Sequence, residues 1–147
     1  MTIPSNLVQQ GTLNRLLTNL TLSNYPALNV TPGYMSKKFI VASFDGSPVT
    51  QQATATGVVN SPEPFLMGSF SFGLLRTQAL ANAWLNQVQL YSVLGTATGY
   101  SDSSAYQSVT LSNASITAYD PGGWDGMDAT VNVTITGVYY LNNTIWG

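Results

Sequence analysis

The side chains able to carry acid–base or metal chemistry are few in this chain of 147 residues. There is no histidine and no cysteine, which removes the usual general base near neutral pH, the Ser-His-Asp and Cys-His triads, and thiolate zinc sites. A glycosidase would need two carboxylates facing each other across the scissile bond. The spacing of the carboxylates selects no such pair, so the sequence favours no enzyme; these residues are Asp45, Glu63, Asp102, Asp120, Asp125 and Asp128.

Three of these aspartates fall within residues 120–128, DPGGWDGMD. Calcium prefers hard oxygen ligands supplied by flexible loops, so a cation site is conceivable here. The spacing does not match the EF-hand pattern, and tight turns favour Asp and Gly for backbone reasons alone. Neither GxGxxG nor GxxxxGK occurs. We therefore expect no metal and no cofactor.

Charged residues make up 7% of the chain, against roughly 25% in an average domain, while hydrophobic residues are near normal at 44%. Ser, Thr, Asn and Gln replace the missing charges. A neutral, hydroxyl- and amide-rich surface suits protein–protein contact because no charge must be desolvated, so the composition favours self-assembly. A secreted polar β domain would have a similar composition.

The basic residues are Arg15, Lys37, Lys38 and Arg76, too few for a nucleic-acid-binding patch. Residues 1–6 (MTIPSN) have no basic and apolar regions of the signal-peptide kind, and no window approaches 18 uncharged apolar residues. These features predict a protein kept in the cytoplasm with no membrane span.

Most of the chain is predicted to form β-strands. Residues 38–45 (KFIVASFD) and 50–60 (TQQATATGVVN) predict a hairpin with a polar second strand, whose turn is Asp45, Gly46, Ser47 and Pro48. After the prolines of SPEP, a strand resumes over 65–72. Residues 107–119 and 128–141 predict two long strands, and 93–108 a loop between helix and strand.

The strand over 128–141 has the clearest period of two in the sequence. Alternate residues from Ala129 to Leu141 are predicted to face a core, and the opposite face is polar, with Thr130, Asn132, Thr134 and Thr136. One helix is predicted over 74–90, with a buried stripe of Leu80, Trp84, Val88 and Tyr91 and a stop near Gly95.

The elements together predict one domain over residues 1–147, with an N-terminal arm over about residues 1–20 that leads into a strand. Its class is mostly β, α+β: an antiparallel β-sandwich or barrel of five or six strands with one packed α-helix. Trp124 and Trp146 lie in a loop and at the C-terminal end. They are candidate anchors for a partner subunit, or part of a sugar-binding platform.

The order of these elements resembles the tail tube proteins of tailed bacteriophages, particularly those with contractile tails. The segments that carry the resemblance are GTLNRLLTNLTL, YPALNVTPGYM, SPEPFLMGSFSF and LLRTQALANAWLNQ. The likeness covers roughly residues 5–90 by local pattern and the remainder by strand order.

The resemblance implies a structural protein of the virion tail, assembled in the host cytoplasm. It implies six-membered rings, in which the sheets of neighbouring subunits join into one barrel around a lumen. The rings stack into a tube through a hairpin and terminal arms, DNA passes through during genome ejection without specific binding, and the partners are sheath, tape-measure and baseplate proteins.

Carried over to this sequence, the resemblance assigns ring stacking to the hairpin turn Asp45, Gly46, Ser47 and Pro48. It assigns the lumen either to Thr130, Asn132, Thr134 and Thr136 or to the polar face of residues 50–59. The helix around Trp84 would face outward on its polar side. The alternative is a carbohydrate-binding β-sandwich module of a phage fibre or baseplate.

Overall fold

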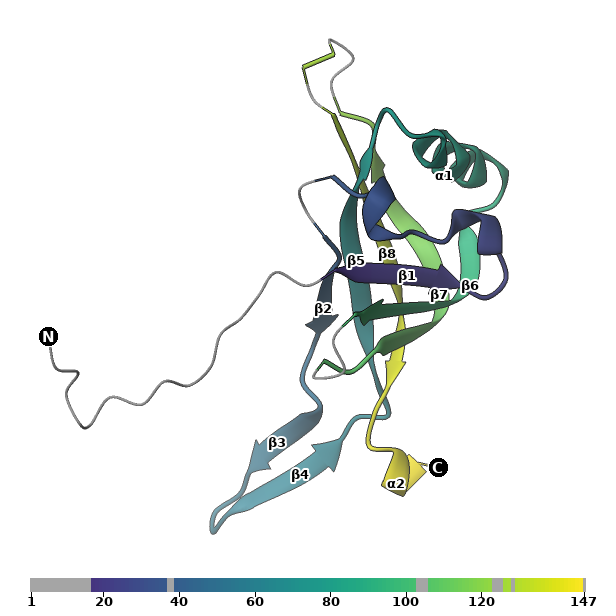
Figure 1. Cartoon of the computed structure of the whole chain (residues 1–147). Helices are drawn as coiled ribbons and strands as arrows, with labels where there is room; N and C mark the ends of the chain where they lie inside the picture. Colours follow the sequence, from purple (N-terminus) through teal and green to yellow (C-terminus); the bar gives the residue numbers. More distant parts are fainter. Residues whose placement is uncertain (1–16, 37–38, 103–105, 123–125, 128, 147) are drawn as a thin grey trace, which may run out of the picture.

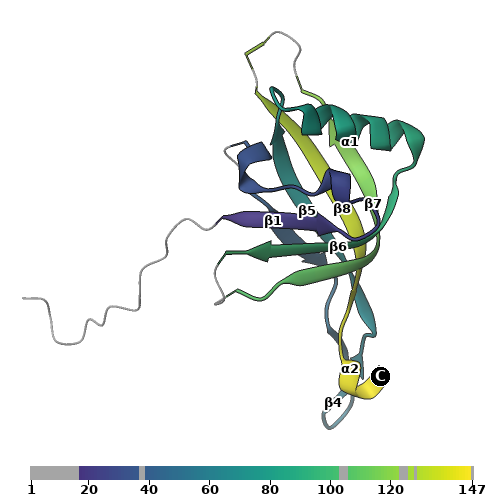
Figure 2. The same ribbon diagram turned by 45° about the vertical axis from the view of Figure 1, so that its right-hand side comes forward.

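The main element of the computed structural model is one antiparallel sheet, which curls into a half-barrel (Figures 1 and 2). The structure describes residues 17–36, 39–102, 106–122, 126–127 and 129–146. Within them, six strands pair in the order β1-β6-β7-β8-β5-β2. Their bounds are β1 Thr18–Leu22, β2 Val41–Asp45, β5 Phe65–Leu75, β6 Val93–Ser101, β7 Val109–Asp120 and β8 Thr130–Tyr140. The predicted class, mostly β with an antiparallel barrel-like sheet and one main packed helix, is confirmed.

The longest continuous pairing in the sheet is that of β5 and β8, which stays in register over eleven residues. Alternate residues of both strands face inward, so Phe70 lies opposite Ile135 and Phe72 opposite Val133, all of them buried. The period of two over residues 128–141 therefore predicts the correct face of β8, because one-sided burial leaves only one favourable register.

Strand β6 corrects the prediction that residues 93–108 form a loop. Leu94 and Ala97 are both buried although they are three residues apart, because the register with β7 shifts around Gly95. Gly95 has a φ of +86°, and a Cβ at this position would lie 2.2 Å from Nδ2 of Asn24. A bulge that needs glycine explains why the strand shows no simple alternation.

Helix α1 (Ala79–Leu90) packs on one end of the curled sheet and closes the core (Figure 2). Trp84 is fully buried, with its ring edge-to-face against Phe72 at a centroid distance of 5.5 Å. From the sheet side, the Tyr119 hydroxyl donates a 3.1 Å hydrogen bond to the Ala81 carbonyl. The helix therefore contacts the sheet through both apolar packing and a hydrogen bond.

The predicted helix was too long and its stripe extended too far. Residues 74 and 75 belong to β5, where Leu74 is buried in the sheet. Leu80 and Trp84 are buried as predicted, whereas Val88 is half-buried and Tyr91 is 59% exposed. Tyr91 leaves the stripe because the helix ends at Leu90 and Tyr91 has extended backbone.

The segment between β1 and β2 covers the open side of the core with two 3₁₀ turns, η1 (Pro26–Leu28) and η2 (Pro32–Tyr34). Leu20 and Leu22 of β1 are buried, which confirms the strand predicted at the end of the N-terminal arm. Residues 1–16 of that arm lie outside the described residues.

The predicted hairpin is wrong in its pairing. Strand β3 (Val49–Ala53) pairs with β4 (Val58–Pro62), and β2 pairs with β5 instead. The tip of the hairpin is thus the turn at residues 54–57, where Thr54 Oγ1 accepts a 3.0 Å hydrogen bond from the Gly57 amide. Asp45, Gly46, Ser47 and Pro48 form the junction between sheet and hairpin; the error arose because DGSP is a strong local turn signal.

The packing of α1 predicts that Trp84→Ala lowers the free energy of unfolding by about 3–5 kcal/mol, since it removes a fully buried aromatic side chain. Urea unfolding followed by circular dichroism measures this change. Leu85→Ala, on the exposed side of the same helix, is the matched control and should cost less than about 1 kcal/mol. Equal losses in the two variants would contradict the proposed role of Trp84.

Tyr119 predicts a loss of stability at alkaline pH. Burial raises the pKa of its hydroxyl above the usual 10.0, and the Arg76 charge opposes that rise more weakly. Because the folded state holds the proton more tightly than the unfolded state, this contribution is complete below pH 10 and is lost as pH rises through the folded-state pKa. In urea unfolding at pH 8 and pH 11, Tyr119→Phe should lose less stability between the two conditions than the wild type; an equal loss would contradict the prediction.

Candidate assembly surfaces

The hairpin of β3 and β4 projects from the body as an arm (Figure 1). Every residue of β3 is exposed, as is β4 up to its last residue, with Val58 and Val59 exposed by 57% and 54%. Residues 49–62 contain no charged side chain. An isolated two-stranded ribbon is marginally stable in water, and exposed valines on an uncharged ribbon are typical of a surface that packs against another protein.

Cross-strand polar pairs hold the arm together. The Gln51 amide donates a 2.9 Å hydrogen bond to Asn60 Oδ1 on the opposite strand. The Thr50 hydroxyl donates to a carboxylate oxygen of Glu63 at 3.0 Å. These bonds keep the two strands in register without any contribution from a packed core.

The predicted stacking residues lie at the root of the arm. Asp45 ends β2, and Gly46 has a φ of +99°, a conformation that favours glycine. The carbonyl of Pro48 accepts a 2.9 Å hydrogen bond from the Glu63 amide, which closes the ribbon at its base. Residues 46–48 thus connect β2 of the main sheet to the first strand of the arm.

The two edges of the main sheet differ. At β1, the amide and carbonyl of Leu20 bond to the carbonyl and amide of Val30 at 2.8 and 2.9 Å, so the chain itself covers this edge. At the other edge, β2 bonds to β5 on one side, and none of the described residues bonds to its outer side. An uncovered strand edge is a template for pairing with another chain.

The outer face of the sheet, opposite the core, is rich in hydroxyls. Thr130, Asn132, Thr134 and Thr136 share this face of β8, as their alternation predicts. Ser71 and Ser69 of β5 lie opposite Thr134 and Thr136. The Thr117 hydroxyl of β7 is 2.9 Å from that of Thr136, so the hydroxyls bond to one another across strands.

The charge on this outer face is negative. Asp45 on β2 and Asp120 on β7 share it, since they pair with Met67 and Asn132 respectively. The sequences of the six strands contain no Lys or Arg. The guanidinium of Arg76, beyond the end of β5, donates to the Pro121 carbonyl. Over the described strands this face carries hydroxyls and carboxylates without a cation, so it offers no attraction to a phosphate backbone.

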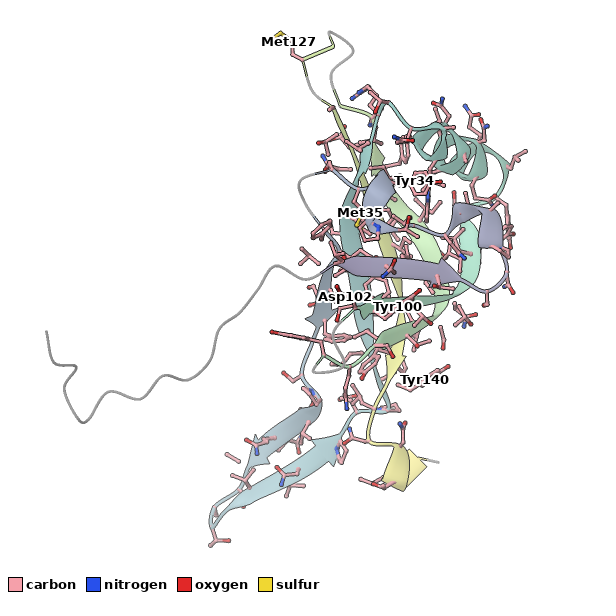
Figure 3. All side chains as sticks on the ribbon, in the orientation of Figure 1. Tyr34, Met35, Tyr100, Asp102, Met127 and Tyr140 are labelled. Carbon is pink, nitrogen blue, oxygen red and sulfur yellow. The ribbon has the colours of Figure 1, made fainter. Side chains whose placement is uncertain are left out.

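Towards the arm, the same face becomes apolar. Phe65 and Tyr140 lie opposite each other and are 46% and 56% exposed, and Met67 follows on β5. Figure 3 shows Tyr140 at the end of β8, close to the root of the arm. These three exposed apolar side chains thus lie at the end of the sheet from which the arm projects.

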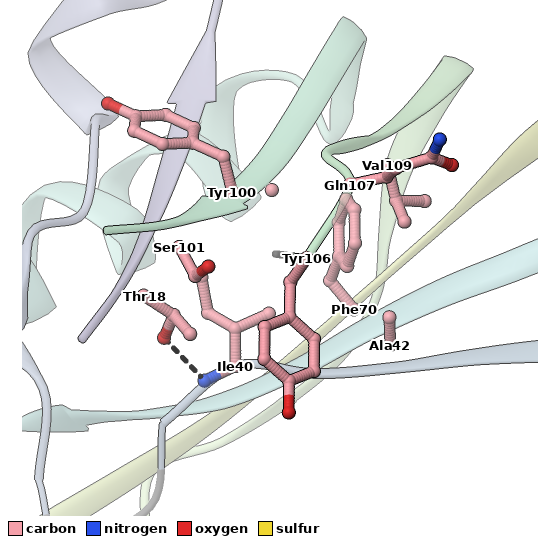
Figure 4. A pocket seen from close by; sticks show the side chains of 10 residues that line it. Thr18, Ile40, Ala42, Phe70, Tyr100, Ser101, Tyr106, Gln107 and Val109 are labelled. Atoms are coloured by element: carbon pink, nitrogen blue, oxygen red, sulfur yellow. Dashed lines mark hydrogen bonds between the residues drawn. The ribbon is translucent and has the colours of Figure 1, made fainter. Parts of the chain in front are cut away.

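A pocket of about 210 Å³ opens where the two sheet edges approach each other. Figure 4 shows Ile40 beside Thr18, with the Ile40 amide donating a 3.2 Å hydrogen bond to the Thr18 hydroxyl. Phe70 and Tyr106 contribute apolar walls. The lining is mainly apolar, and it contains no charged residue.

The carboxylates that were considered for catalysis occupy separate places. Asp102 accepts from the Leu17 amide at 3.2 Å, Asp120 from the Gly122 amide at 3.0 Å, and Glu63 lies at the arm. Asp45 lines a different pocket, of about 160 Å³, with Ser and Thr hydroxyls. Within the described part of the chain, no three His, Cys, Asp or Glu side chains form a group able to hold a metal ion.

Four sequence-predicted residues cannot be placed fully. Asp125, Asp128 and Trp124 lie outside the described residues. Trp146 ends the short helix α2 (Asn143–Trp146), and its side chain is not described. Over the described residues, none of the helices combines the length and apolar character needed to cross a membrane.

Sequence reasoning placed the arm incorrectly and missed the residue at its root, Asn142. The signal for the arm was available, since residues 49–62 form an uncharged stretch bounded by prolines. The Asn142 side chain donates to carbonyls 79 and 94 residues away, and no local pattern predicts such contacts.

No protein-family model matches the chain, and no curated protein matches it. Among solved structures, it is similar to a chain of the anti-feeding prophage cap, which terminates the tube of that particle. The TM-score is 0.49 and the identity 16%, over 96% of this chain and 100% of the other. A chain of the anti-feeding prophage baseplate gives a TM-score of 0.40 and 14% identity, over 92% and 95%. Similarity at this level does not indicate a function, so the function is inferred from the surfaces of this chain.

The exposure of the arm predicts that the body folds without it. When residues 49–62 are replaced by a Gly-Gly link, the far-ultraviolet circular dichroism should remain that of a β protein, because no buried core residue is removed. The melting temperature should fall by less than about 5 °C. Loss of the folded spectrum would show that the arm is part of the folding unit.

Proposed function

We propose that this chain is a structural subunit of a phage-type tail tube, which joins with copies of itself into rings that stack into a tube. The observation that carries the proposal is the arm: a ribbon with exposed valines and no charge, held away from the body. Such a ribbon is costly to leave in water and becomes favourable when a second copy covers it.

Ring formation follows from the difference between the two edges of the sheet. The β1 edge is covered by the chain itself, whereas β2 is open along the described residues. Strand addition to β2 from a neighbouring copy would satisfy its outer backbone groups. When the added strand is a different segment of the neighbouring copy, the contact is head-to-tail and closes into a ring if the rotation between copies permits; the resemblance implies six copies.

The outer face suits the lining of a lumen through which DNA passes. Its hydroxyls bond to one another, as those of Thr117 and Thr136 do, and its carboxylates Asp45 and Asp120 repel phosphate. This supports the strand face of Thr130, Asn132, Thr134 and Thr136 as the lining. The polar face of residues 50–59 is less suitable, because those residues belong to the projecting arm.

The remaining roles follow from the resemblance. The outward side of α1 would contact a sheath in a contractile tail, and the ends of the tube would meet baseplate and tape-measure proteins. The stacking role moves from the turn at Asp45–Pro48 to the whole arm, with that turn as its root. Trp146, at the end of α2, remains a candidate subunit anchor.

Electron microscopy of the purified, concentrated protein tests the proposal. Rings or tubes are expected, and replacement of residues 49–62 by Gly-Gly should leave single rings or monomers without stacking. Monomers at every concentration, or small particles retained on a glycan column, would contradict it and favour a carbohydrate-binding module.

The open edge makes a second prediction about assembly. Ser43→Lys places a charge in the middle of β2 and should prevent ring closure, because a lysine on an edge strand opposes pairing with another strand. Ala118→Lys is the matched control: it places the same charge on the same face, in an inner strand. Sedimentation velocity should show monomers for the first variant and assembled species for the second; equal effects would show that edge pairing is not the contact.

A further inference from the structure

We propose that the Asn142 side chain sets the direction of the arm relative to the sheet. This is a positioning role, and it deepens the proposed function because the arm is the stacking element there. The Asn142 amide nitrogen donates two hydrogen bonds, to the Glu63 carbonyl at 2.7 Å and to the Pro48 carbonyl at 3.1 Å. Pro48 precedes β3 and Glu63 follows β4, so one side chain contacts both ends of the ribbon.

Both hydrogens of the amide are used at this place. A primary amide carries two donors at a fixed angle, and here each donor reaches a carbonyl on a different segment. A serine or threonine hydroxyl could reach only one carbonyl, and a carboxylate would repel both. The positions of the two carbonyls therefore favour a side-chain amide over a hydroxyl or a carboxylate.

The backbone of Asn142 is also adapted to the position. Its φ is +54°, in the left-handed region, which asparagine and glycine adopt more readily than other residues. This conformation turns the chain between the end of β8 and the helix α2, in which the Ile145 amide bonds to the Asn142 carbonyl at 3.0 Å. Asn142 is thus held by its own neighbours while its side chain holds the arm.

The other contacts at the root have different roles. The bond from the Glu63 amide to the Pro48 carbonyl closes the ribbon on itself and does not tie it to the body. The Leu141 amide bonds to the Pro64 carbonyl at 3.1 Å, which continues the pairing of β8 with the strand after the arm. Asn142 is therefore the described side chain that ties both strands of the arm to β8.

Small changes at the root are magnified at the tip. Five residues of strand at about 3.3 Å each give an arm of about 17 Å, so a rotation of about 20° at the base moves the tip by about 6 Å. That displacement exceeds the spacing between neighbouring strands. An arm that must meet a fixed surface on another copy therefore needs a rigid root.

The experiment measures arm direction within single copies, because the labelled chain is diluted with unlabelled chain, so the result does not depend on assembly. The chain has no cysteine, and Thr56→Cys at the tip with Ala118→Cys on β7 gives two spin-labelling sites without background. Electron–electron double resonance should give a narrow distance distribution for this protein. Asn142→Gly keeps the positive φ but removes the amide, and Asn142→Asp keeps the shape but reverses the interaction with the carbonyls; both should broaden the distribution.

Amide hydrogen exchange supplies a second readout. The amide of Glu63 should exchange about tenfold faster in Asn142→Gly, as expected when a hydrogen-bonded tie is removed. The amides of Phe70 and Ile135 in the central strands should not change, because those strands do not depend on the root. A role confined to general stability would instead raise exchange in all of these positions together.

Asn113→Gly is the matched control. Asn113 also has a positive φ, +52°, but lies within the irregular part of β7. This variant should leave the distance distribution narrow. If both Asn142 variants keep a narrow distribution and unchanged Glu63 exchange, the proposal is overturned. If the distribution broadens but the wild type forms no ring or tube, the positioning role stands and the proposed function fails.

Discussion

This structure depends on how the backbone hydrogen-bonding groups at the edges of its sheet are satisfied. Peptide groups on the outer side of an edge strand must bond to something, and the chain provides for one edge by laying Val30 beside Leu20. Among the described residues, no group bonds to the outer side of β2. The β1 edge is therefore covered, whereas the β2 edge can still pair with another strand.

The two faces of the sheet divide the remaining roles. The inner face carries the core that Trp84 closes, and the outer face carries hydroxyls and two carboxylates. Both follow from the alternation along β8, in which one set of residues is apolar and the other polar. The same strands therefore supply both the core and the outer surface. A one-residue slip in register would move the apolar residues to the outer face and the polar residues into the core.

The sequence predicted those features that depend on the alternation of polar and apolar residues within one element. The face of β8 and the burial of Leu80 and Trp84 were predictable, because burial imposes a regular period. Strand β6 was missed because Gly95 interrupts that period with a bulge. The arm was placed incorrectly because the partner of β3 is chosen by competition between distant strands, and the root contact of Asn142 joins segments that are far apart in sequence.

The neutrality of the arm has a consequence for the speed of encounter. Proteins that meet through oppositely charged surfaces are steered towards each other, whereas uncharged surfaces associate at about 10⁵–10⁶ M⁻¹ s⁻¹. With no charge in residues 49–62, two free copies would collide many times before docking correctly. In the tube proposed above, a subunit would then join more readily at an existing end that orients it than by chance encounter in solution, which would limit premature polymerisation while many subunits are free.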